Sequence, residues 1–111
     1  SSGNRQARRA LKSALKILDS SGESSENIYT HIYNAFVSFV NHKIGSRKVE
    51  YSKRELMNIL KTRNLDRICP KLEKILKRGE AVRFAPVSSQ DAHLDLQEMR
   101  QLLKEVDHEW F

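Results

Sequence analysis

Apolar residues recur at intervals of three and four along most of the chain, a spacing that predicts amphipathic helices. It predicts five of them, at about residues 5–18, 26–43, 52–63, 65–78 and 90–110. The second is the most apolar, so we expect it to be central and to contact most of the others. The pattern therefore predicts an all-α fold, a compact bundle of about five helices.

Residues with known preferences for helix ends separate these segments. Ser52 and Glu55 have the spacing of a capping box, and Gly45 can take the left-handed conformation that ends a helix. The other expected end signals are Ser24 or Ser25, Pro70 in a first turn, Gly79 as a stop, and Ser88 or Ser89.

The segment that follows Gly79 is the one stretch without a helical pattern. Val82 and Phe84 alternate along it, and Pro86 leads into the last helix. We therefore expect residues 81–86 to cross the bundle in extended form, with Val82 and Phe84 on one side. Arg83 then lies on the opposite side, free to contact a partner. Arg83, Phe84 and Pro86 form the first candidate interaction segment.

Length and composition are those of one domain. The chain has 111 residues, of which 39% are apolar. We interpret residues 1–4 as a tag remnant or a frayed end, and residues 5–111 as a single helical domain. The one cysteine, Cys69, allows no internal disulfide and fits a reducing compartment.

Charge is unevenly distributed along the sequence, whose net charge is +6. Basic residues predominate in 1–20 and 41–83, whereas acidic residues predominate in 84–111. This distribution fits an anionic partner, but opposite charges can also neutralise one another in the fold. The first helix has a basic face that suits either the cytoplasmic side of a membrane or plain solvent: Arg5, Arg8, Arg9, Lys12 and Lys16.

Motifs for catalysis, metal binding or phosphate binding are missing from the sequence. The four histidines stand outside any metal-ligand pattern, and the glycines are isolated. We therefore expect no enzymatic activity and no cofactor. A small basic nucleic-acid-binding domain is an alternative, because the third and fourth helices are short, basic and adjacent. Their lysines suit phosphate contact rather than base recognition.

Several segments together resemble the C-terminal region of BatD-type proteins of the bacterial aerotolerance operon. The resemblance covers residues 5–110 and is most specific at Tyr51-Ser52-Lys53-Arg54-Glu55-Leu56 and at Arg83-Phe84-Ala85-Pro86. It implies that residues 5–111 are the C-terminal part of a larger membrane-anchored protein. This part would be a helical domain on the cytoplasmic face of the bacterial inner membrane, preceded by a transmembrane helix. The implied partners are other proteins of the operon: a MoxR-type AAA+ ATPase and proteins with von Willebrand factor A domains. The function expected from it is noncatalytic docking of those partners.

Overall fold

A computed structural model describes the backbone of residues 2–110 and the side chains of residues 5–110. Its elements are α1 (Ser2–Arg8), α2 (Ala10–Asp19), α3 (Ser25–Ile44), α4 (Lys53–Thr62), the 3₁₀ helix η1 (Asp66–Ile68), α5 (Cys69–Ala81) and α6 (Ser89–Glu109). No strand occurs within residues 2–110, so the all-α prediction is confirmed. The number of helices differs from five, because the first expected helix is divided at Arg9 into α1 and α2.

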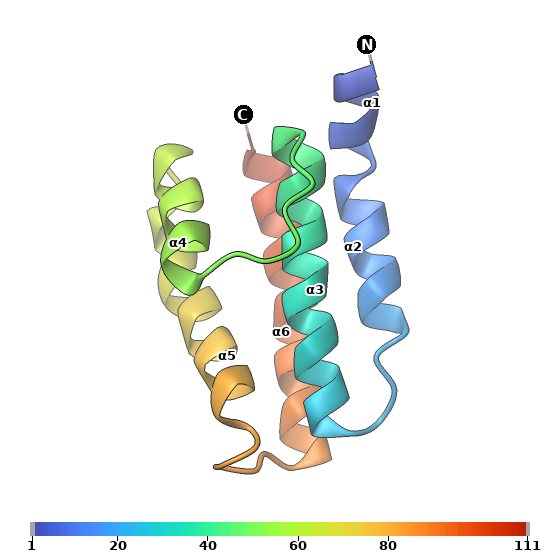
Figure 1. The fold of residues 1–111 in the computed structure, drawn as a ribbon, viewed down its shortest axis with the longest axis vertical. Helices are drawn as coiled ribbons and strands as arrows, with labels where there is room; N and C mark the ends of the chain where they lie inside the picture. Colours follow the sequence, from blue (N-terminus) through green and yellow to red (C-terminus); the bar gives the residue numbers. More distant parts are fainter. Residues whose placement is uncertain (1, 111) are drawn as a thin grey trace.

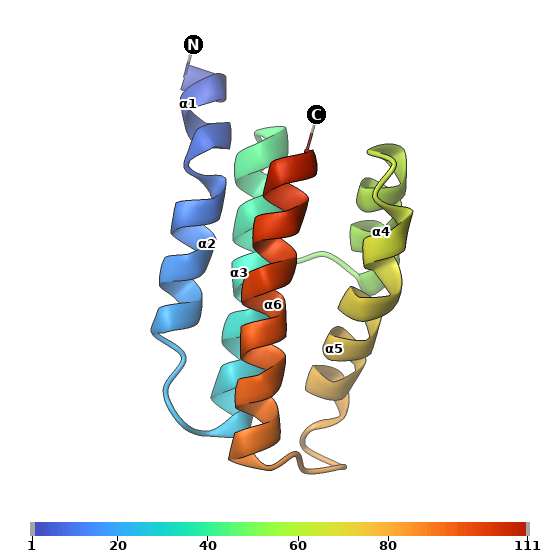
Figure 2. The ribbon, with the colours of Figure 1, turned by 180° about the vertical axis from the view of Figure 1, so that it is seen from behind.

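Helix α3 is the central element, as its apolar sequence predicted. It contacts α1, α2, α5 and α6. Helix α2 packs on one side of the α3–α6 pair, and α4 and α5 lie on the other (Figure 1). The same three-part arrangement is seen from behind (Figure 2). The bundle measures 43 × 26 × 23 Å, with its long axis along these helices.

The predicted helix ends are confirmed where they depend on local hydrogen bonds. The Ser24 side chain accepts a hydrogen bond from the amide of Asn27, and the Ser88 side chain accepts one from Asp91. Ser52 and Glu55 form the complete capping box at the start of α4. Gly45 ends α3 in the left-handed conformation, with φ of 69°.

The extended crossing expected at residues 81–86 is wrong. Helix α5 continues through Gly79 to Ala81, and the amides of Phe84 and Ala85 then donate to the Ala81 carbonyl in a tight turn. Phe84 is 88% exposed, whereas Val82 is buried. Val82 lies two turns from Ile75 and stays on the apolar face, whereas Phe84 lies in the turn after the helix with its ring exposed.

Gly79 has a packing role instead of ending the helix. It lies within α5, and a Cβ atom added there would be 3.1 Å from the Cβ of Tyr29 on α3. The missing side chain therefore allows α5 and α3 to approach closely at this point.

Opposite charges from different parts of the sequence meet in the fold. Acidic residues of α6 pair with three basic residues of η1 and α5: Arg67 with Glu105 and Glu109, Lys71 with Glu98, and Arg78 with Asp95. Arg67, Lys71 and Arg78 belong to the fourth predicted helix, which forms part of the alternative nucleic-acid-binding surface. Each of them already forms an ion pair within the protein.

The basic face at the start of the chain remains uncompensated. Its side chains are all exposed, and none forms an ion pair with another described residue: Arg5, Arg8, Arg9, Lys12 and Lys16. Of the expected tag remnant or frayed end, residue 1 lies outside the described residues, and the backbone of residues 2–4 belongs to α1. None of the described helices combines the length and apolar character needed to span a membrane.

Candidate interaction groove

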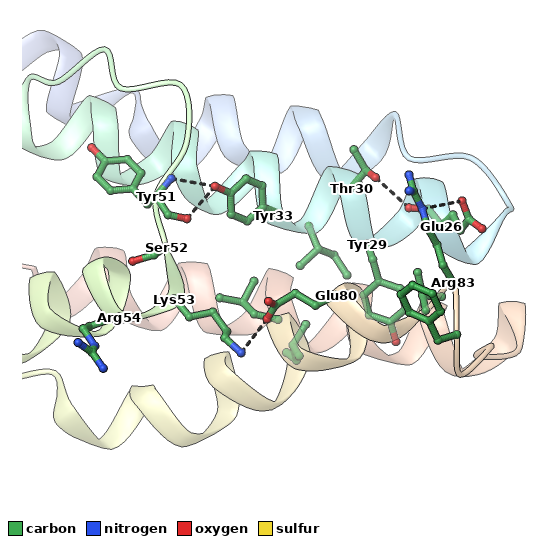
Figure 3. Close-up of a pocket in the computed structure, with 16 residues that line it drawn as sticks. Glu26, Tyr29, Thr30, Tyr33, Tyr51, Ser52, Lys53, Arg54, Glu80 and Arg83 are labelled. Atoms are coloured by element: carbon green, nitrogen blue, oxygen red, sulfur yellow. Dashed lines mark hydrogen bonds and ion pairs between the residues drawn. The ribbon is translucent and has the colours of Figure 1, made fainter.

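A groove of about 690 Å³ lies between α3 and the α4–α5 side of the bundle (Figure 3). One wall is the first half of α3, and the other is formed by the start of α4 and the end of α5. The segment before α4 borders one end, and the turn after α5 borders the other. Its deepest apolar side chains are those of Ile32, Ile75 and Leu76.

Tyr33 and Tyr51 fix the end of the groove near α4. The Tyr33 hydroxyl donates to the Tyr51 carbonyl and accepts from the Tyr51 amide, both at 2.8 Å (Figure 3). The Tyr51 hydroxyl donates to Asn41 Oδ1 at 2.6 Å. These bonds hold the segment leading to α4 across α3 and leave the Tyr33 ring as part of the groove wall.

A buried carboxylate fixes the other aromatic residue of the wall. The Tyr29 hydroxyl donates to Asp95 Oδ2, and Arg78 Nη1 donates to Asp95 Oδ1, both at 2.5 Å. Burial, followed by the hydrogen bond to Asp95, raises the pKa of Tyr29 above its ordinary value. The hydroxyl therefore stays protonated near neutral pH and acts as a permanent donor that joins α3 to α6.

The charged side chains of the groove are mostly paired with each other. Lys53 Nζ lies 2.7 Å from Glu80 Oε1, and Arg83 Nε lies 3.9 Å from Glu26 Oε2 (Figure 3). The fifth charged side chain of the lining, that of Arg54, is exposed and forms no ion pair with a described residue. The rim thus carries three cations against two carboxylates, with Arg54 the one left over.

The structure separates the residues that the sequence singled out. Arg83 and Phe84 line the groove at its α5 end, and Pro86 is exposed beyond it. Arg83 is not free, because it faces Glu26, and it lies on the same groove as Phe84 instead of opposite to it. The basic face of α1 and α2 is not part of the groove.

Sequence reasoning missed the contribution of Lys53, Arg54 and Asp95. Lys53 and Arg54 lie inside the predicted capping box and inside the segment that carries the resemblance, but neither feature indicates that these two side chains line a groove. Asp95 follows Ala92 by three residues and precedes Leu96, within the apolar stripe of α6. A carboxylate at such a position indicates a buried polar partner.

The groove is chemically suited to binding. Its lining contains no histidine or cysteine, and its titratable groups are lysine, arginine, glutamate and tyrosine. Cys69 lies elsewhere in the core, where burial raises the pKa of its thiol, away from the range of a reactive cysteine. Among the described residues, no group of three or more acidic, histidine or cysteine side chains could hold a metal ion.

Comparisons with protein-family models, with curated proteins and with solved structures give no significant match for this chain.

Proposed function

We propose that this chain is a noncatalytic protein–protein interaction domain that binds a partner in the groove between α3 and the α4–α5 side. The observation that carries the proposal is Phe84, which is 88% exposed at the edge of a groove whose walls are held by buried hydrogen bonds. A large apolar side chain exposed beside a preformed groove is typical of a binding site. The resemblance to BatD-type proteins supplies the partner candidates: a MoxR-type ATPase and proteins with von Willebrand factor A domains.

The proposed location is the cytoplasmic face of the bacterial inner membrane, next to a preceding anchor. The uncompensated face of α1 and α2 supports it, since clustered lysines and arginines are attracted to anionic lipid headgroups. Changing Arg5, Arg8, Arg9 and Lys12 together to Glu is expected to abolish sedimentation with phosphatidylglycerol vesicles. Unchanged sedimentation would count against a lipid contact by this face.

Binding of each candidate partner to the domain tests the docking function. In calorimetric titrations we expect one operon product to bind, and Phe84→Ala to weaken that binding at least tenfold. Lys74→Glu is the matched control, because Lys74 is exposed on α5 and does not line the groove. If none of the operon products binds at high micromolar concentration, the proposal is wrong.

A further inference from the structure

We infer that the groove accepts a partner segment in which an apolar side chain is flanked on both sides by acidic residues. This inference rests on the proposed interaction function and names the chemistry of the partner. A docking function by itself does not specify that the partner segment has an apolar side chain at its centre or acidic residues on both sides of it.

The apolar centre follows from the side chains between the two ends of the groove. Tyr33 presents its ring there because its hydroxyl is used by Tyr51, and Ile75 and Leu76 lie beneath. Phe84 stands at the edge with nearly all of its surface exposed. A leucine or an aromatic side chain placed between Tyr33 and Phe84 removes apolar surface from water on both sides, about 25 cal/mol for each Å² buried.

The acidic flanks follow from the two arginines at the ends. Arg54 lies at the α4 end without an ion pair among the described residues, and Arg83 lies at the α5 end (Figure 3). The contact between Arg83 and Glu26 is long, at 3.9 Å, and its side chains are 77% and 59% exposed. Such an exposed pair contributes little, so a partner carboxylate can compete for Arg83.

The two carboxylates of the rim do not reverse this preference. Glu80 is held at 2.7 Å by Lys53, and Glu26 faces Arg83. A basic partner has to displace these cations, whereas an acidic one finds Arg54 available. The net charge of the lining therefore favours an anionic segment.

The walls of the groove need little ordering when a partner binds. Tyr29 is fixed by Asp95, Tyr33 is fixed by the Tyr51 backbone, and Gly79 brings α5 against Tyr29. Preorganised walls reduce the entropy lost on association. Side-chain adjustment then falls on exposed lining residues such as Arg54, Arg83 and Phe84.

Selection from a phage library of random nonapeptides tests the inference without any operon protein. We expect enriched peptides with one or two central apolar residues and Asp or Glu on either side. In fluorescence polarisation with a selected peptide, Arg54→Glu and Phe84→Ala are each expected to raise Kd at least tenfold, and Lys74→Glu less than twofold. Affinity for the peptide is also expected to fall as salt rises.

Several results would overturn the inference. These are enrichment of basic or wholly polar peptides, no enrichment after repeated rounds, and binding that survives both groove substitutions. Circular dichroism of each variant shows whether a loss of binding reflects unfolding, and Arg83→Glu, fully at the surface, provides a second groove variant for that case. Failure of this inference can be distinguished from failure of the proposed function. An operon protein that binds equally well to wild type, Phe84→Ala and Arg54→Glu contradicts the groove chemistry alone. Groove-dependent peptides together with no operon partner contradict only the proposed identity of the partners.

Discussion

Asp95 is expected to contribute more to stability than any other acidic side chain of the described chain, because it is buried and accepts a buried hydrogen bond from Tyr29. Asp95→Ala removes the acceptor of the Tyr29 hydroxyl, and Tyr29 is only 4% exposed. A buried donor left without an acceptor costs about 1–3 kcal/mol. The Arg78 side chain is 40% exposed, so it can turn to water, and its loss adds less than about 1 kcal/mol.

Together, the orphaned Tyr29 donor and the lost Arg78 pair predict that Asp95→Ala lowers the free energy of unfolding by about 1–4 kcal/mol. For a domain of this size the melting temperature should fall by about 10 °C. Glu98→Ala on the same helix is the matched control, because Glu98 pairs with Lys71 where both side chains are about half exposed. It should change the free energy of unfolding by less than about 0.5 kcal/mol.

Urea denaturation followed by circular dichroism measures both variants, and Tyr29→Phe completes a double-mutant cycle with Asp95→Ala. We expect a coupling energy of about 1 kcal/mol between Tyr29 and Asp95. A stability loss from Asp95→Ala no larger than that from Glu98→Ala would refute the reasoning. So would a coupling energy near zero, since it would mean that the Tyr29–Asp95 hydrogen bond does not stabilise the fold.

Four further predictions follow from single positions. Phe84→Ala should change the free energy of unfolding by less than about 0.5 kcal/mol, because the ring is exposed, and a melting temperature several degrees lower would contradict this. Gly79→Val should destabilise by about 1–3 kcal/mol in urea denaturation, since the new side chain meets Tyr29 at the helix contact; an unchanged midpoint would show that α5 can move away. Ser52→Ala should cost about 1 kcal/mol through loss of the α4 cap, and Ser52→Gly only a few tenths, measured in the same way. The folded-state pKa of Tyr29 is raised, so the stability that its protonated hydroxyl contributes is complete below the unfolded-state pKa of about 10 and decreases as the pH rises above that value. The wild type should therefore lose more stability between about pH 9 and about pH 11.5 than Tyr29→Phe, as measured by urea denaturation at each pH.

The parts of the fold that depend on neighbouring residues could be predicted from the sequence. The capping box of Ser52 and Glu55 and the left-handed Gly45 involve atoms within one helical turn. The central place of α3 follows from the width of its apolar face, which other helices must cover. Each of these features is determined by a spacing that the sequence shows directly.

The course of residues 79–86 could not be predicted from the local sequence, because Gly79 packs against a residue distant in the chain. Gly79 was read as a helix stop, but its role depends on Tyr29, fifty residues earlier in the chain. Because α5 continues past Gly79 to Ala81, residues 82–84 form a turn instead of an extended segment. Val82 is then buried and Phe84 exposed, so their alternation in the sequence does not place them on one side. The division at Arg9 is different: neither proline nor glycine stands there, and nothing in the local sequence explains it.

The groove itself could not be predicted from the sequence, which singled out only Arg83 and Phe84 from its α5 end as candidate interaction residues. Its residues come from three helices, and the sequence gives no spacing that relates Tyr33 to Arg54 or Arg83. The Tyr33–Tyr51 hydrogen bonds that fix the α4 end use backbone atoms, which any residue except proline could supply at position 51. Only the unusual position of Asp95 in the stripe of α6 was a sequence signal for the buried contact behind Tyr29.

The basic and acidic regions that are separate along the sequence lie side by side in the fold. The acidic residues of α6 are largely taken up by η1, α5 and α3, through pairs such as Lys71–Glu98 and Lys43–Asp107. Among the described residues, the cations without an ion pair include the basic face of α1 and α2 and Arg54 beside the groove. Helix α2 and the α4–α5 side lie on opposite sides of the α3–α6 pair (Figures 1 and 2). In the proposed arrangement, with α1 and α2 against an anionic surface, the groove therefore lies across the α3–α6 pair from that surface, and a partner segment is expected to reach Phe84 and Arg54 there.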